Sequence, residues 1–126
     1  MVILITGKRG AGKTTHAKTL AREIMQNDGM AAVVFDGDEV RNIHGNQDYT
    51  DAGRFAHLKS IAHDAAVVEG TGNIAIVAVI SPKREWRDMM RSEWQESRLV
   101  YLPGGTLWPG TDYERPSIGE FDVYRK

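Results

Sequence analysis

A glycine-rich segment near the start of the sequence has residue types and spacing that suit the binding of a phosphate chain. Residues 7–14 fulfil the pattern G-x-x-x-x-G-K-[ST] and stand between an apolar run and a stretch with helical periodicity. Glycines let such a backbone curl so that several N–H groups converge on a β-phosphate, and the following helix adds the positive end of its dipole. The alternative is a glycine-rich turn with a solvated lysine. We predict an ATP site formed by Gly7, Lys8, Arg9, Gly10, Ala11, Gly12, Lys13, Thr14 and Thr15.

Within this segment two side chains have a specific chemical role. Lys13 is expected to bridge the β- and γ-phosphates, and the Thr14 hydroxyl is expected to ligate Mg²⁺. Asp36 and Asp38 follow the next apolar run, where they can hold the metal or accept a proton from an attacking hydroxyl, and Arg41 can bind an anionic group. A turn and helix cap would use the same Asp and Gly residues, so that interpretation stays open. Thr14 and Asp36 are the predicted metal ligands.

Length and composition are those of one globular domain. The chain has 126 residues, 41% of them hydrophobic and 26% charged, with a net charge of -1. No global positive field would attract nucleic acid or a membrane, and the apolar start is too short for a signal peptide or a membrane span. The absence of cysteine is compatible with a cytoplasmic location. The four histidines have no partners in a zinc motif, and we expect them at the surface.

Strand-like and helix-like segments alternate along the chain. This order predicts an α/β fold of three layers around a mainly parallel sheet of four to five strands. The helix after residue 80 carries Trp86, Met89, Met90 and Trp94 at helical spacing, which favours core packing or an oligomer contact. Strands are predicted at residues 2–5, 31–35, 74–80, 99–102 and, at a sheet edge, 121–124; helices are predicted at 13–26, at 50–69 with Thr50 as N-cap, and from Ser81 as N-cap onward.

Three segments in order resemble the adenylylsulfate kinase family of P-loop kinases. They read Gly-x-x-Gly-Ala-Gly-Lys-Thr-Thr, Asp-Gly-Asp-Glu-Val-Arg and Ile-Ser-Pro-Lys-Arg-Glu-Trp-Arg-Asp, and residues 109–116 resemble a fourth family segment. The resemblance implies a single P-loop kinase domain over residues 1–126 that uses ATP and Mg²⁺. In this family ATP phosphorylates the 3′-hydroxyl of adenosine 5′-phosphosulfate (APS).

Family roles carried onto matching positions give a candidate acceptor site. The resemblance makes Asp38 the catalytic carboxylate, together with Lys13 and Arg41. It also implies that two aromatic rings stack on the substrate base, a contact that any planar base can make; the alternative for both rings is core packing. The implied substrate-binding residues are Asp36, Asp38, Arg41, Tyr49, Arg54, His57, Ser81 and Trp108.

The sequence departs from the family at two places. His57 stands where an asparagine is usual, so contacts to the sulfate or ribose are expected to differ. The lid that normally follows the fourth strand is nearly deleted, since only five residues separate Leu102 from Trp108. Lids exclude water and bring arginines to the transferred phosphoryl group. Lys8, Arg84 or Arg87 could replace that charge, or the two arginines could belong to a solvated helix face.

The sequence therefore predicts a Mg·ATP-dependent phosphotransferase that acts on a nucleotide-like small molecule. One alternative is a kinase for another nucleotide, a nucleic-acid end or a hydroxymethylated base in DNA, which would give the enzyme a DNA acceptor. Another is a nucleotide-binding module with weak or no catalysis. No membrane partner is expected, and a homo-oligomer is compatible with the aromatic stripe.

Overall fold

A single parallel sheet organises the chain. The computed structural model describes residues 1–107, 109 and 111–124. The sheet has five strands in the order β2-β3-β1-β4-β5, and every neighbouring pair is parallel. The predicted α/β fold with a parallel sheet is confirmed. The elements are β1 (Val2–Gly7), α1 (Lys13–Asp28), β2 (Ala32–Asp36), α2 (Gly37–His44), α3 (Asp51–Gly70), β3 (Ile74–Val79), α4 (Arg84–Ser92), β4 (Ser97–Leu102) and β5 (Val123–Tyr124).

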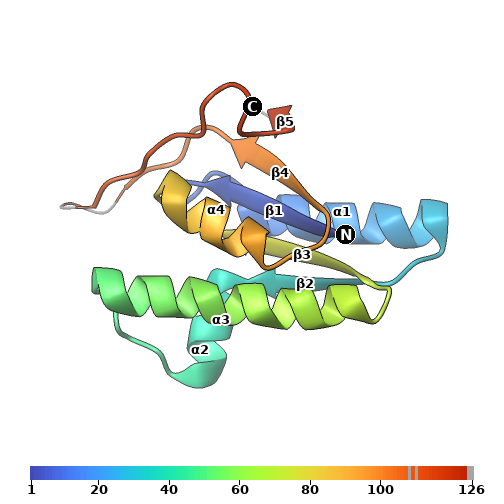
Figure 1. Cartoon of the computed structure of the whole chain (residues 1–126). Helices are drawn as coiled ribbons and strands as arrows, with labels where there is room; N and C mark the ends of the chain where they lie inside the picture. Colours follow the sequence, from blue (N-terminus) through green and yellow to red (C-terminus); the bar gives the residue numbers. More distant parts are fainter. Residues whose placement is uncertain (108, 110, 125–126) are drawn as a thin grey trace.

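Helices cover both faces of the sheet (Figure 1). On one face α3 and α4 bury Leu58, Ile61 and Met90 against β1, β3 and β4. On the other face α1 buries Ala17 and Ile24. The central strands are apolar on both sides because both of their faces are covered, as is usual for parallel sheets. The three predicted layers are therefore present, and the carboxyl ends of the strands form one edge of the sheet.

Helix starts agree with the sequence at α3 and differ at α4. The Thr50 side chain accepts a hydrogen bond from Gly53 N, as an N-cap does, which confirms that prediction. Ser81 does not cap α4, because α4 begins at Arg84 with Lys83 as N-cap. Ser81 has instead a positive φ of 41°. No helix was predicted at residues 37–44, although a helix cap at Asp36 was one of the interpretations left open, and Asp36 is the N-cap of α2.

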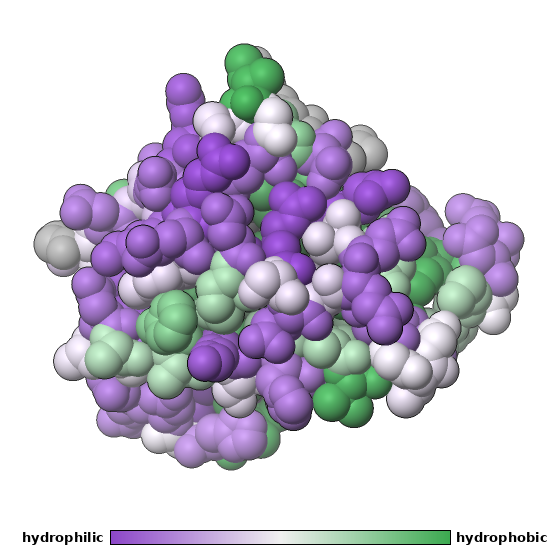
Figure 2. Space-filling model, in the orientation of Figure 1, coloured by the Kyte–Doolittle hydropathy of each residue, from purple (hydrophilic) through white to green (hydrophobic). Residues whose placement is uncertain are grey.

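The aromatic stripe of α4 belongs to the core. Trp86 and Met90 are buried, and the Trp94 indole just beyond the helix donates to Ala62 O at 2.9 Å. Figure 2 shows a mostly hydrophilic face with hydrophobic residues in small separate groups. Core packing therefore explains the stripe, and a homo-oligomer stays a prediction. In the part of the chain that the structure describes, no helix is long and apolar enough to cross a membrane.

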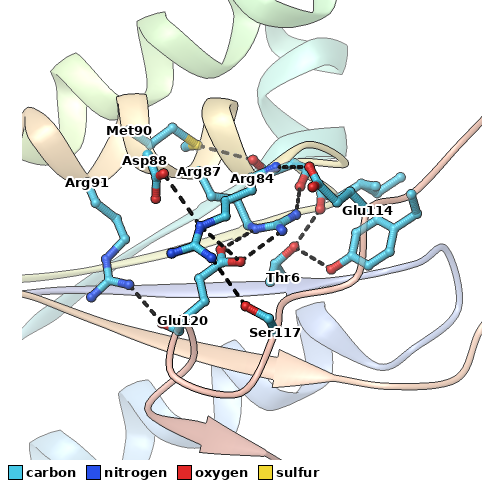
Figure 3. A network of polar contacts seen from close by, with 12 residues as sticks. Thr6, Arg84, Arg87, Asp88, Met90, Arg91, Glu114, Ser117 and Glu120 are labelled. Carbon is cyan, nitrogen blue, oxygen red and sulfur yellow. Dashed lines mark hydrogen bonds and ion pairs between the residues drawn. The ribbon is translucent and has the colours of Figure 1, made fainter.

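A buried ion pair fastens the C-terminal segment to α4 (Figure 3). Arg87 is fully buried, and its Nε and Nη2 donate to the two Glu120 carboxylate oxygens at 2.6 and 3.1 Å. Its Nη1 donates to Ser81 O at 2.8 Å. Both expectations for Arg87, a solvated helix face and a replacement for lid charge, are therefore wrong. The Arg87 guanidinium is bound to Glu120, which is 33 positions away in the sequence.

Candidate active site

The glycine-rich segment forms the connection between β1 and α1. Gly12 is the N-cap of α1 with a φ of 95°, a conformation that glycine adopts at little steric cost. The loop closes on itself, since Ala11 N donates to Lys8 O at 3.2 Å. Thr15 is exposed on the first turn of α1, and Arg9 and Gly10 are exposed at the loop. The backbone thus curls at the amino end of a 16-residue helix, as a phosphate-binding loop requires.

Lys13 places a cation against this loop. Its Nζ donates to Lys8 O at 2.8 Å. Burial lowers the pKa of Lys13 from its usual value of 10.5, and the Asp38 and Asp36 carboxylates oppose that shift. The ammonium is therefore partly stripped of water between a carbonyl and two acidic residues. A phosphate that entered the loop would supply the negative charge that this position favours.

The Thr14 hydroxyl donates a hydrogen bond to Asp36 Oδ2. The other Asp36 oxygen, Oδ1, accepts from Asp38 N at 3.0 Å and from Glu39 N at 3.2 Å, so it caps α2. Asp36 therefore serves both interpretations at once, with one oxygen in the cap and one facing Thr14. Two hard oxygen donors side by side fit Mg²⁺, which usually takes one or two protein ligands beside phosphate oxygens and water. Among the described residues no group of three His, Cys, Asp or Glu side chains could hold a metal alone.

Asp38 lies on the first turn of α2 and is exposed. Its carboxylate is near enough to both Lys13 and His57 to raise the pKa of each of them electrostatically, against the larger effect of burial. An exposed carboxylate beside the lysine of a phosphate loop can reach a hydroxyl that approaches bound phosphate. This placement suits the role of a base or an orienting group.

Arg41, on α2, and Tyr49, in the loop that follows α2, form a second group. The buried Arg41 donates from Nη1 to Asp48 O at 3.2 Å. Its guanidinium carbon lies 4.4 Å from the centroid of the Tyr49 ring. Tyr49 is 66% exposed, so its ring lies outside the core and can be reached by a planar ligand.

His57 connects α3 to the start of α2. Its Nε2 lies 3.2 Å from Gly37 O, and the side chain is buried, so the expectation that all the histidines lie at the surface is wrong for this one. Burial is the main cause that lowers the pKa of His57 from 6.5, and the charge of Arg41 adds to it. Next to His57, a groove of 210 Å³ is lined by Val40, His44, Asn46, Ala56, His57 and Ser60.

The remaining predicted acceptor residues are dispersed. The Arg54 guanidinium carbon lies 5.9 Å from the Trp86 ring centroid, at the α3–α4 contact. The Ser81 hydroxyl is buried and donates to Met90 Sδ at 3.8 Å, so it is directed into the core. Trp108 lies outside the described residues. The structure therefore brings together Lys13, Thr14, Asp36 and Asp38. The helix α2 connects a second group to them, because α2 carries Arg41, which contacts Tyr49, and begins at Gly37, which contacts His57.

One polar contact at this edge had no signal in the sequence. Thr6, at the carboxyl end of β1, donates to Ile80 O at 2.5 Å and lies 2.9 Å from the Tyr113 hydroxyl. Burial raises the pKa of Tyr113 to about 12. Tyr113 is 107 residues away from Thr6 in the sequence, so the contact between the two hydroxyls is known only from the folded chain.

Comparisons with known proteins agree with this geometry. The family model for adenylylsulphate kinase matches residues 1–103. A probable adenylyl-sulfate kinase of Archaeoglobus fulgidus is 37% identical over 101 residues, which cover 79% of this chain and 64% of that protein. Across the first curated relatives the chain spans between 46% and 64% of their length.

Solved structures point to the same family. The APS kinase CysC of Mycobacterium tuberculosis, as a cysteine-to-alanine mutant, superposes with a TM-score of 0.82 at 25% identity, covering 98% of this chain and 83% of that one. The same kinase in complex with AMPPNP and APS gives a TM-score of 0.74 at 26% identity, covering 80% and 61%. Since the family model covers most of the sequence and the fold is that of these P-loop kinases, the chain belongs to the adenylylsulphate kinase family.

Proposed function

We propose that this protein is an ATP-dependent kinase that transfers the γ-phosphate of ATP to the 3′-hydroxyl of adenosine 5′-phosphosulfate. The observation that carries the proposal is the arrangement at one sheet edge. The curled loop with Lys13 lies beside the Thr14–Asp36 pair, and Asp38 is on the first turn of α2, which Asp36 caps. The solved structure of a family member in complex with AMPPNP and APS supports the choice of both substrates.

The residues divide the work of binding and transfer. Loop amides and Lys13 bind the β- and γ-phosphates, while Thr14 and Asp36 would hold Mg²⁺, which supplies positive charge to the phosphate oxygens. Asp38 orients the acceptor hydroxyl and takes its proton as the oxygen attacks the γ-phosphorus. The bond from the γ-phosphorus to the bridging oxygen of ADP breaks, and ADP leaves with that electron pair. Electrostatic stabilisation by Lys13 therefore accompanies a proton transfer to Asp38.

The acceptor would lie on the α2 side of this edge. Arg41 binds the phosphosulfate group, and the exposed Tyr49 ring stacks on the adenine. Arg54, which lies over the Trp86 ring at the α3–α4 contact, is proposed as a second cation for the phosphosulfate group. Trp108 is proposed as the second ring of that slot. Ser81 is proposed to line the acceptor site just after β3. Its hydroxyl donates to Met90 Sδ and is not proposed as a contact to the acceptor.

A direct assay separates this proposal from its alternatives. The protein receives γ-labelled ATP and Mg²⁺ with APS, mononucleotides or hydroxyl-bearing DNA, and labelled product is resolved for each acceptor. We expect transfer to APS above the rate of ATP hydrolysis. Transfer to DNA or to another nucleotide would replace the acceptor in the proposal. ATP binding without transfer to any of them would leave a nucleotide-binding module.

A further inference from the structure

The segment that follows β4 contacts the phosphate loop directly. Thr106 N donates to Arg9 O at 2.8 Å, and the two residues form an antiparallel bridge. Gly105 lies beside them against the backbone of Arg9 and Ala11. We call residues 105–106 the P-loop brace. In this chain the residues that follow β4 therefore rest on the phosphate loop itself.

The Thr106 hydrogen bond fixes the direction of one peptide group in the loop. In a trans peptide the C=O of Arg9 and the N–H of Gly10 point in opposite directions. Because Arg9 O accepts from the brace, the Gly10 N–H points away from it. The neighbouring Ala11 N donates to Lys8 O, and Lys13 Nζ donates to the same oxygen. The brace and Lys13 therefore hold the loop from two sides in its curled form.

Gly105 allows the brace to approach this closely. A Cβ at Gly105 would overlap the Arg9 carbonyl oxygen and would lie 3.0 Å from Ala11 N. Gly104 next to it offers a contrast. Both glycines have positive φ, 96° at Gly104 and 73° at Gly105, but a Cβ at Gly104 would meet nothing within 4 Å. An added side chain would therefore strain the backbone at both positions, but only the Cβ added at position 105 would push on the phosphate loop.

We propose that the P-loop brace is a positioning element for the triphosphate, which orients the Arg9–Gly10 peptide so that the loop is set for phosphate before it binds. The nature of the ligand as ATP rests on the proposed function. A loop held in its binding form loses less conformational freedom on binding, and affinity rises accordingly. Displacement of the brace should therefore weaken binding of the phosphate chain and leave acceptor binding unchanged.

The first test compares Gly105→Ala with Gly104→Ala. Calorimetry measures the Kd of Mg·ATP and of inorganic tripolyphosphate, each below the Tm of the variant. We expect Gly105→Ala to raise both Kd values about tenfold or more, since one peptide orientation toward a charged ligand is lost. Gly104→Ala should stay within about twofold of the parent by the same measurement. Equal affinities in the two variants, or a fall in Tm alone for Gly105→Ala, would overturn the proposal.

A second pair of variants acts on the hydrogen bond itself. Thr106→Pro lacks the backbone N–H that donates to Arg9 O, and the ring Cδ takes the place of the donated hydrogen, so the bond is lost and the brace is moved away from Arg9 O. Thr106→Ala keeps this N–H, so its affinity for ATP should match that of the parent. We expect weakened ATP and tripolyphosphate binding in the proline variant, with an unchanged Kd for APS. Parent-like ATP affinity in Thr106→Pro would also overturn the proposal. The proposed function can fail separately from the brace. If the parent protein binds ATP, Lys13→Ala does not, and the parent transfers no phosphate to APS, then the proposed function fails. The brace is still tested by the affinities for ATP and tripolyphosphate.

Discussion

At the residue scale, Lys13 combines a functional role with a cost to the folded state. Burial lowers its pKa, so the folded chain disfavours the charged ammonium relative to water. In Lys13→Ala we expect Mg·ATP affinity to fall at least about tenfold, because a charge-assisted contact to phosphate is lost. The Tm of the unliganded variant should be unchanged or higher. Calorimetry and a thermal scan check both, with the exposed Lys59→Ala as control.

An unchanged ATP affinity in Lys13→Ala would remove the phosphate role from this residue. A large fall in Tm would instead show that Lys13 contributes to the fold through its bond to Lys8 O.

Asp38 separates binding from transfer. Its carboxylate is exposed next to Lys13 and makes neither of the α2 cap bonds, which belong to Asp36. We expect Asp38→Asn to lower single-turnover transfer by roughly 10²-fold or more, with ATP affinity within a few-fold. Glu39→Gln on the same turn is the matched control. Equal transfer rates in the Asp38→Asn variant and the parent would exclude a catalytic role.

His57 makes stability depend on pH. Its folded-state pKa is lowered from 6.5, chiefly by burial, so the unfolded chain takes up a proton at a higher pH than the folded chain. As pH falls below about 6.5 the unfolded state binds that proton first, and the free energy of unfolding decreases. His57→Gln keeps an N–H for Gly37 O and should reduce the loss of Tm between pH 7 and pH 5. Exposed His63→Gln is the control, and parallel pH profiles for His57→Gln and the parent would contradict this account.

At the element scale, α4 starts with a cap that another segment provides. Its own N-cap, Lys83, makes no side-chain cap bond, and Glu114 Oε1 accepts from Arg84 N at 2.8 Å. Glu114 N also donates to Pro82 O at 2.6 Å, which ties the two segments together. The sequence signal Ser81-Pro82 therefore predicted a helix in the right region with the wrong first residue.

Loss of this distant cap should have a measurable cost. We expect Glu114→Ala to lower the free energy of unfolding by about 1 kcal/mol, the usual value for a helix cap. Glu114→Gln keeps a side-chain oxygen and should lose less. Urea denaturation measures both. If the alanine variant is as stable as the parent, Arg84 N is satisfied by water and Glu114 does not act as the cap.

At the scale of the whole molecule, the Arg87–Glu120 pair joins the C-terminal segment to α4 and to Ser81 (Figure 3). Arg87→Met leaves the buried Glu120 with only the half-exposed Arg84, at 3.9 Å, as a partner, so the change should cost up to roughly 3–5 kcal/mol, the usual loss when a buried pair is broken. The exposed pair of Arg98 and Glu96, at 3.8 Å, gives the control, because Arg98→Met should cost less than about 1 kcal/mol.

Denaturant unfolding compares these two variants with Arg87→Met/Glu120→Leu. The double variant should recover part of the loss, since no buried charge is then left alone. A cost for Arg87→Met as small as that for Arg98→Met would show that the C-terminal segment adds little to the stability of the fold.

Features that depend on local pattern could be predicted from the sequence. Glycine spacing predicted the loop at residues 7–14, apolar runs predicted the parallel strands, and Thr50 predicted the start of α3. These features are local because a loop conformation, a buried strand and a cap each require particular residue types within a few positions. The order of the phosphate loop and the two carboxylates along the chain was also enough to place them at one sheet edge, since parallel strands end together.

The long-range partners of the polar groups, in contrast, became known only from the folded chain. Arg87 was assigned to solvent or to the phosphate, but Glu120 and Ser81 O take it; Ser81 was expected to cap α4, but Glu114 does so. The brace on Arg9 could not be foreseen either, because nothing in residues 105–106 shows which backbone they contact. Side chains pair across long stretches of sequence according to where the folded elements bring them, and residue types alone leave several partners open for each charge. The arrangement of layers and strand ends removes that choice.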